Sequence, residues 1–188
     1  MASTGSLSGR SRRGRNLRLA ALVATLAGLV AACGDGGSDV DAGPAPSLPT
    51  GCTPIRSPKI LEASHIPTGQ TATYNTTPPS SGKHYASPAR AGGYTEPIKN
   101  EAQVHNLEHG HVLIQYRGIT TAQINELGDL LQKDPEKVVF APYPDMEPAL
   151  AFTSWGKIQT CDAWSDSIPA LVSYFIRANR DNAPESIN

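Results

Sequence analysis

Three histidines lie within the segment Val104-His105-Asn106-Leu107-Glu108-His109-Gly110-His111. All five histidines of the 188-residue chain fall between His65 and His111, and none follows. Neutral imidazole is the commonest protein ligand for zinc and copper. The clustering therefore predicts a transition-metal site in this part of the chain.

Spacing selects the candidate ligands. Residues four apart on a helix project from one face, so His105 and His109 can ligate one ion. His84 and His65 are the remaining candidates for a site with three or four imidazole ligands. Glu108 is expected either to ligate or to orient an imidazole. Tyr85, next to His84, is expected to contact the ligands without binding the ion itself. His111 begins a predicted strand and is the weakest candidate.

Two other readings of the same residues stay open. His105, Glu108 and His109 match the H-x-x-E-H pattern of some zinc peptidases, in which the glutamate is the general base. The third zinc ligand would then come from His84, His65 or Glu147. The predicted helix is short for such an enzyme and ends at Gly110. The other reading is a structural or interaction domain whose histidines hydrogen-bond to the backbone.

The side chains around the cluster give little further guidance. Copper and zinc fit imidazole ligands equally well in an exported protein. Met146 could be a soft ligand, but an exposed loop methionine is the favoured interpretation. Tyr74, Tyr85 and Trp155 are expected to form walls near the cluster.

The N-terminus has the features of an export signal over residues 1–32. A basic stretch holds five arginines: Arg10, Arg12, Arg13, Arg15 and Arg18. The apolar run that follows, Leu19 to Ala32, has about 14 residues and is too short for the roughly 20 that span a bilayer. It ends in Val-Ala-Ala-Cys33, which resembles a bacterial lipobox. The order of these features predicts acylation of Cys33 and an extracytoplasmic, lipid-anchored protein.

Residues 33–51 are predicted to be a flexible tether, because Gly, Pro, Ser, Asp and Ala dominate them. Residues 52–188 are long enough for a single globular domain. Without the five signal arginines, 11 basic residues face 17 acidic ones, a net charge of −6. This charge argues against nucleic-acid binding. Cys52 and Cys161 are expected to form a disulfide in an oxidising compartment.

Periodicity and turn residues predict the order strand, helix, strand, strand, helix after an irregular, loop-rich segment. The strands are expected at residues 111–117, 137–143 and 149–155, and a further short strand at Thr71 to Tyr74. The helices are expected at residues 121–133, with Thr120 or Thr121 as N-cap, and at 166–180, after a short helix at 99–109. The expected fold is α+β, a small mixed sheet with packed helices. Its first two long strands are parallel, and the strands joined by the short link at 144–148 form an antiparallel pair.

Several motifs resemble one bacterial family. They are Tyr74-Asn75 with Pro78-Pro79-Ser80-Ser81-Gly82-Lys83-His84-Tyr85, the segment Val104 to Gly110, Thr153-Ser154-Trp155-Gly156, and Ala183-Pro184-Glu185. Together they are similar to the family called domain of unknown function 3105, over roughly residues 65–185. The resemblance implies no activity. Its motif histidines correspond to His65, His84, His105 and His109, whereas His111 departs from the pattern.

Overall fold

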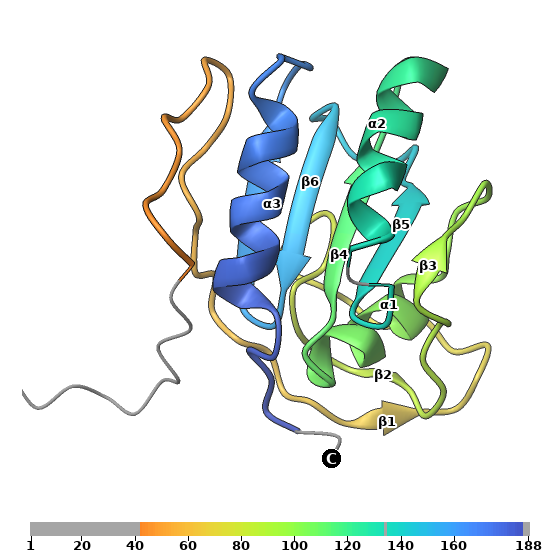
Figure 1. The fold of residues 1–188 in the computed structure, drawn as a ribbon. Helices are drawn as coiled ribbons and strands as arrows, with labels where there is room; N and C mark the ends of the chain where they lie inside the picture. The colour runs from red at the N-terminus through yellow and green to blue at the C-terminus, as the bar shows by residue number, and fades with distance from the viewer. Residues whose placement is uncertain (1–41, 134, 186–188) are drawn as a thin grey trace, which may run out of the picture. The chain divides into compact units, whose positions relative to one another are not determined.

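The computed structural model describes residues 42–133 and 135–185, shown as a ribbon in Figure 1. The predicted signal at residues 1–32, Cys33 and the first part of the predicted tether lie outside the described residues. Three helices are present in the described part: α1 (Asn100–Glu108), α2 (Thr121–Leu131) and α3 (Ile168–Asn179). No helix among the described residues is long and apolar enough to cross a membrane.

A five-stranded mixed sheet forms the centre of the domain, with strand order β3-β5-β4-β6-β7. Its strands are β3 (Gly92–Gly93), β4 (Val112–Tyr116), β5 (Val138–Pro142), β6 (Leu150–Ser154) and β7 (Lys157–Cys161). β4 and β5, which α2 connects along the chain, pair in parallel, as the strand–helix–strand order predicts. The α+β fold class is therefore confirmed.

The pairing of β6 differs from the expectation. β6 is antiparallel, but it pairs with β4 rather than with β5, the strand before it in the chain. The strand predicted at Thr71 to Tyr74 is wrong, since this segment has no strand pairing. Conversely, β7 was not predicted, although it forms a hairpin with β6 through the two residues Trp155 and Gly156.

Side chains on the two faces of the sheet pack against different layers. Val112 and Ile114 of β4 belong to the main apolar core, together with Phe175 of α3 and Leu127 of α2. Leu113, which points the other way, packs with Val104 and Leu107 of α1 in a second cluster. Figure 1 shows α2 and α3 together on one face of the sheet. Because both faces are covered, β4 is buried along its whole length and its sequence does not alternate.

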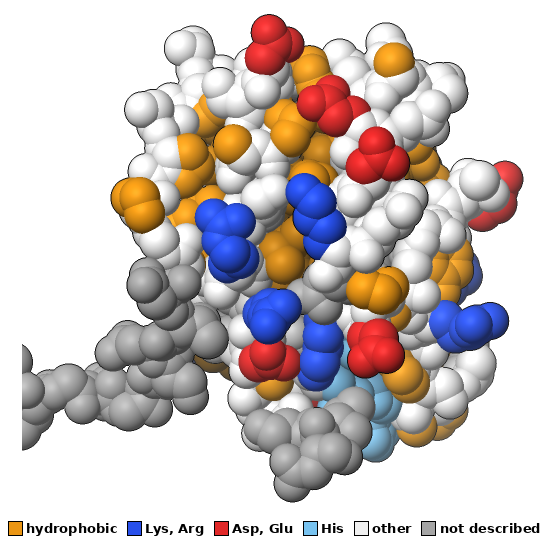
Figure 2. All heavy atoms as spheres, in the orientation of Figure 1, with side chains coloured by type: hydrophobic (Ala, Val, Ile, Leu, Met, Phe, Trp, Pro, Cys, Tyr) orange, Lys and Arg blue, Asp and Glu red, His pale blue; other side chains and the backbone are white. Residues whose placement is uncertain are grey.

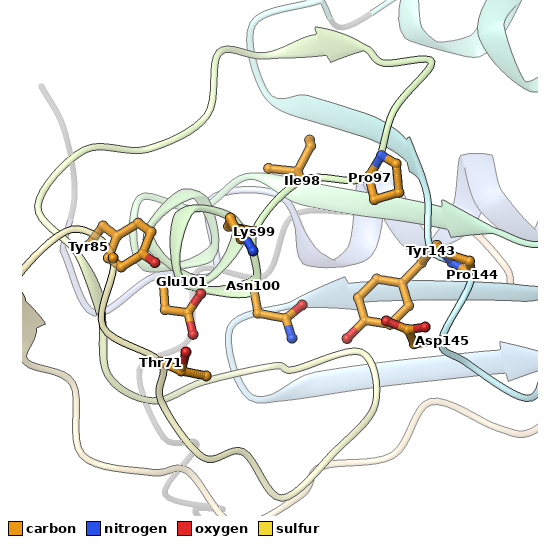
Figure 3. Close-up of a pocket in the computed structure, with 11 residues that line it drawn as sticks. Thr71, Tyr85, Pro97, Ile98, Lys99, Asn100, Glu101, Tyr143, Pro144 and Asp145 are labelled. Atoms are coloured by element: carbon orange, nitrogen blue, oxygen red, sulfur yellow. The ribbon is translucent and has the colours of Figure 1, made fainter.

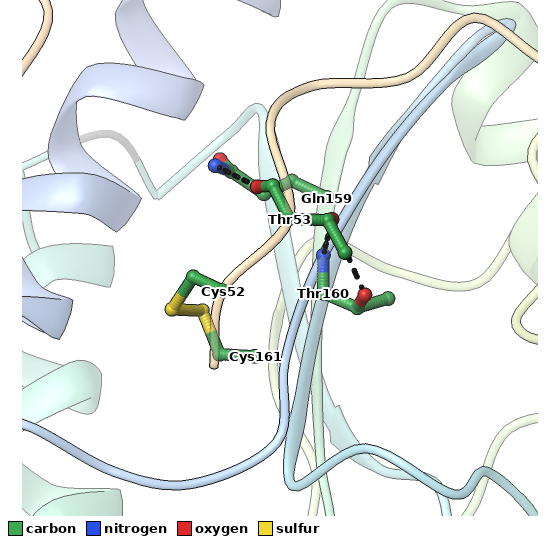
Figure 4. The surroundings of a disulfide bond; sticks show 5 residues. All are labelled: Cys52, Thr53, Gln159, Thr160 and Cys161. Carbon is green, nitrogen blue, oxygen red and sulfur yellow. Dashed lines mark hydrogen bonds between the residues drawn. A yellow bond between two sulfur atoms is a disulfide. The ribbon is translucent and has the colours of Figure 1, made fainter. Parts of the chain in front are cut away.

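A disulfide fastens the N-terminal segment to the edge of this sheet. Cys52 and Cys161 are bonded, as predicted, across a sequence separation of 109 residues. Thr53 continues the attachment: its N–H donates to the Thr160 carbonyl (2.8 Å), and its own carbonyl accepts from the Gln159 amide (2.8 Å; Figure 4). The chain before Cys52 also lies on the domain, because the Ala42 carbonyl accepts a hydrogen bond from Arg177 of α3 (3.2 Å).

α2 begins at a capping box, and this contact gives a first testable prediction. The Thr120 hydroxyl accepts from the Gln123 N–H (3.3 Å), while the Gln123 side chain accepts from the Thr120 N–H (2.8 Å). Thr120→Ala removes one of these bonds and is expected to lower the free energy of unfolding by about 1 kcal/mol. Urea unfolding measures the loss. Thr121→Ala, at an exposed position one residue on, is the control and should change it by less than about 0.5 kcal/mol.

Candidate metal centre

Two of the histidines lie side by side on a small parallel ladder. β1 (His65–Ile66) pairs with β2 (His84–Tyr85), and His65 is directly opposite His84. Gly82 makes the bend before β2 possible, since its φ is +128° and an added Cβ would lie 3.2 Å from the Tyr74 ring. The His84 N–H then donates to the Ser64 carbonyl (3.0 Å). Residues 19 positions apart in the chain thus become neighbours.

α1 supplies the other members of the cluster. His105 and Glu108 lie in its last turn, and His109 follows as the C-cap. Gly110, with a φ of +78°, ends the helix, and its carbonyl accepts a hydrogen bond from Asp181 (2.9 Å). A Cβ at Gly110 would lie 2.8 Å from the Cα of Asp181, so only glycine fits between the helix and this C-terminal segment.

Four imidazole rings gather where these stretches meet. The ring centres of His65, His84 and His105 lie 5.0–5.3 Å from one another, and those of His105 and His109 lie 4.5 Å apart. His84 and His105 are buried, whereas His65 is exposed. The histidine side chains form one patch at the lower edge of the face drawn in Figure 2. The cluster therefore has a buried side and a side open to solvent.

Backbone carbonyls determine the tautomers of the two buried rings. Nδ1 of His84 lies 2.8 Å from the Gly82 carbonyl oxygen, and Nδ1 of His105 lies 2.5 Å from that of Tyr85. A carbonyl oxygen can only accept, so each Nδ1 carries the hydrogen. In a neutral ring the Nε2 atom then presents a lone pair. Both lone pairs point away from the backbone, as in metal-ligating histidines.

The Nε2 atoms meet other ligand-type atoms at short distances. Nε2 of His105 lies 2.6 Å from Nε2 of His109. Nε2 of His84 lies 2.8 Å from Oε2 of Glu108, and among the described residues this buried atom has no hydrogen-bond partner. Glu108 is itself buried. Within residues 42–133 and 135–185, two groups could hold a metal ion: His65, His84 and His105, and His105, Glu108 and His109, each with ligand atoms within 4.8 Å of one another.

Burial keeps the central ring ready to ligate. Desolvation lowers the pKa of His105, and the neighbouring His109 and His84 lower it further, against the opposing effects of the Tyr85 carbonyl and Glu108. The ring is consequently uncharged at neutral pH. A neutral imidazole is the form that binds a metal ion.

The other candidates from the sequence lie elsewhere. His111 belongs to neither group, and its Nδ1 donates to the Asn106 carbonyl (3.1 Å). Glu147 is exposed and also belongs to neither group. The interpretation of Met146 as an exposed residue is wrong: this residue of the β5–β6 link is 1% exposed and packs with Tyr143 and Ala151. The hydroxyl of Tyr85 donates to the Gln70 carbonyl, and the residue supports the cluster through its backbone carbonyl, which accepts from His105.

Sequence reasoning missed the segment that closes the end of α1. The Glu185 N–H donates to the Glu108 carbonyl (3.3 Å), and Lys137 contacts both the His109 carbonyl (3.4 Å) and Asp181 (3.2 Å). Figure 2 shows basic side chains gathered above the histidine patch. Two sequence signals belong to this docking: Gly110, which was interpreted only as a helix end, and Ala183-Pro184-Glu185, which was interpreted only as a family motif.

The arrangement defines an α+β domain with a histidine and carboxylate cluster that could hold a metal ion. Residues 65–188 match the model of the family described as "Protein of unknown function (DUF3105)". The chain therefore belongs to this family, as its motifs indicate. Comparison with curated proteins found no match, and comparison with solved structures also found none.

Proposed function

We propose that this protein is an exported, lipid-anchored protein that binds one transition-metal ion, copper or zinc, through its histidine cluster. His84, His105 and His109 are the proposed principal ligands; His105 belongs to both groups of ligand atoms, whereas His84 belongs to one and His109 to the other. His65 occupies a fourth position on the solvent side, and Glu108 either ligates or holds the ring of His84. The ion would be bound on the edge of the domain, with access through His65.

The contact between His84 and Glu108 carries the proposal. Because Nδ1 of His84 donates to the Gly82 carbonyl, a neutral ring turns a lone pair toward a carboxylate oxygen 2.8 Å away. Two buried acceptors at this distance repel each other unless a positive species lies between or beside them. A metal ion satisfies both atoms and also the Nε2 atoms of His105 and His109. Without an ion, a proton on Nε2 of His84 would satisfy the first pair, and the Nε2–H tautomer of His109 would satisfy the second.

The direct test is metal retention by the purified full-length chain. After equilibration with zinc or copper and dialysis, the protein should retain about one equivalent, since one tetrahedral site takes four ligands. A chain that retains no metal above a buffer blank would contradict the proposal. The histidines would then be hydrogen-bonded to backbone in a structural domain.

Glu108→Gln separates a ligand or orienting role from a catalytic one. The amide keeps the shape of the side chain and removes its charge, so metal affinity is expected to fall about 10- to 100-fold. Competition with a coloured chelator measures the change. Glu126→Gln, at an exposed position of α2, is the matched control and should leave affinity unchanged. In a hydrolase that uses Glu108 as base, the same variant would lose turnover while keeping its metal. The burial of Glu108 against His84 favours the ligand or orienting role.

Two observations support a location in the cell envelope. The N-terminus has arginines, an apolar run and Cys33 in the order of a lipoprotein signal, and Cys52 and Cys161 form a disulfide. Disulfides persist in oxidising compartments. Cells fed a clickable fatty acid should label the wild-type protein and not the Cys33→Ser variant. Equal labelling of both would contradict lipidation at this residue.

A further inference from the structure

A second site lies at the other end of α1, away from the histidines. A pocket of about 410 Å³ opens between the start of α1, the loop at residues 69–71 and the link after β5. Figure 3 shows the side chains of Tyr85, Glu101, Asn100 and Tyr143 along it. Its volume falls within the range of small-molecule sites.

Glu101 is the buried carboxylate in the lining of this pocket. The residue is 4% exposed, and its Oε1 accepts a hydrogen bond from the Ala72 N–H (3.0 Å). In the described part of the chain, no lysine, arginine or histidine forms an ion pair with it. Glu101 lies in the first turn of α1, close to the partial positive charge of the helix N-terminus. That partial charge offsets only part of the buried negative charge of the carboxylate. Among the described residues, the carboxylate thus has a hydrogen-bond donor but no basic partner.

The walls favour a cation with an apolar body. Tyr85 and Tyr143 are both buried, and Ile98 and Pro97 add apolar surface. Burial raises the pKa of Tyr143, so its phenol stays neutral. Aromatic faces attract ammonium groups as well as hydrocarbon.

The charges that face the pocket are unequal. Asp145, at its exposed rim, adds a second carboxylate, and Lys99 is the single basic residue of the lining. The pocket therefore carries a net negative charge next to aromatic surface.

We propose that this pocket binds a small organic cation, a primary amine with a short apolar or aromatic body, whose ammonium group pairs with Glu101. The body of the ligand lies against Tyr85 and Tyr143. The site does not depend on a metal ion, since none of the four histidines proposed as metal ligands lines it. Tyr85 touches both sites, because its ring lines the pocket and its carbonyl accepts from His105.

Calorimetric titration of the full-length chain tests the charge requirement. The probes are benzylammonium, the neutral isostere benzyl alcohol and the anion benzoate. Benzylammonium should bind at least 10-fold more tightly than benzyl alcohol, and benzoate should not bind, because a buried carboxylate discriminates by charge. Comparable binding of benzylammonium and benzyl alcohol, or no binding of benzylammonium, overturns the proposal.

Variants test the residue assignment. Glu101→Gln keeps an acceptor for the Ala72 N–H and should weaken benzylammonium binding at least 10-fold. Glu126→Gln, at an exposed position of α2, should not. Lys99→Gln removes a like charge and should tighten binding several-fold. If Glu101→Gln fails to fold, the benzylammonium affinity of Asp145→Asn, at the exposed rim, tests the proposal instead. A several-fold weaker affinity then supports the site, and unchanged affinities of Asp145→Asn and Lys99→Gln overturn it.

Discussion

Replacing His105 by alanine is expected to abolish metal retention by the full-length protein. His105 is the one residue shared by both groups that could hold a metal ion, and its Nε2 lies 2.6 Å from that of His109. Loss of a supporting residue alone costs 10- to 100-fold in affinity, so loss of a shared ligand should cost more than about 100-fold. Elemental analysis after dialysis, with chelator competition for the affinity, measures the effect.

His111→Ala is the matched control for this variant. His111 lies six residues further along and is bonded to the Asn106 carbonyl, outside both groups. Its removal should leave both the stoichiometry and the affinity of metal binding unchanged. Equal retention by His105→Ala and wild type, or equal losses in His105→Ala and His111→Ala, would argue against a shared ion.

The second large effect is expected at the disulfide. Replacing both Cys52 and Cys161 by alanine opens a loop of 109 residues. In the chain-entropy model, a disulfide that closes a loop of about 100 residues contributes about 4.7 kcal/mol to the free energy of unfolding. Since small domains are stable by only about 5–15 kcal/mol, the variant should lose a large part of its stability.

Urea unfolding under oxidising and reducing conditions measures this contribution. Wild-type protein in excess dithiothreitol should match the double variant, and the reductant should leave the double variant itself unchanged. Thr53 and its hydrogen bonds to β7 (Lys157–Cys161) remain in both, so the difference isolates the bridge. A reduced wild type as stable as the oxidised one would mean that packing alone holds this segment.

The parts of the fold predicted from sequence are those with strong local signals. β4, β5, β6 and the helices carry apolar runs or helical periodicity, and each lies within a few residues of its expected range. The short strands β1, β2 and β3 have two residues each, too few for any periodicity. β7 was missed because Trp155 and Gly156 are not a typical hairpin dipeptide.

Strand order was also beyond local reasoning. The link after β5 is short, and short links usually join neighbours in a sheet. Here β6 (Leu150–Ser154) instead lies beside β4 (Val112–Tyr116), so the chain crosses one end of the sheet. Met146 became buried in this crossing, which explains why its loop position misled the prediction.

The sequence indicated which residues belong to the cluster, but not how they are held. Histidine clustering identified His65, His84, His105 and His109, and the four-residue spacing on α1 placed His105 and His109 on one face. The ring orientations depend on the carbonyls of Gly82 and Tyr85, and the end of α1 is covered by Asp181 from a distant part of the chain. Backbone groups carry no sequence signal, so these partners required coordinates.

Anomalous diffraction from crystals of the full-length chain grown with zinc tests the central claim most directly. Data collected above and below the zinc absorption edge should give one strong peak about 2.0–2.1 Å from Nε2 of both His84 and His105. Zinc peaks found only at other surface positions, with these two nitrogens bonded to protein or water, would contradict the shared ion and leave the histidines a structural role.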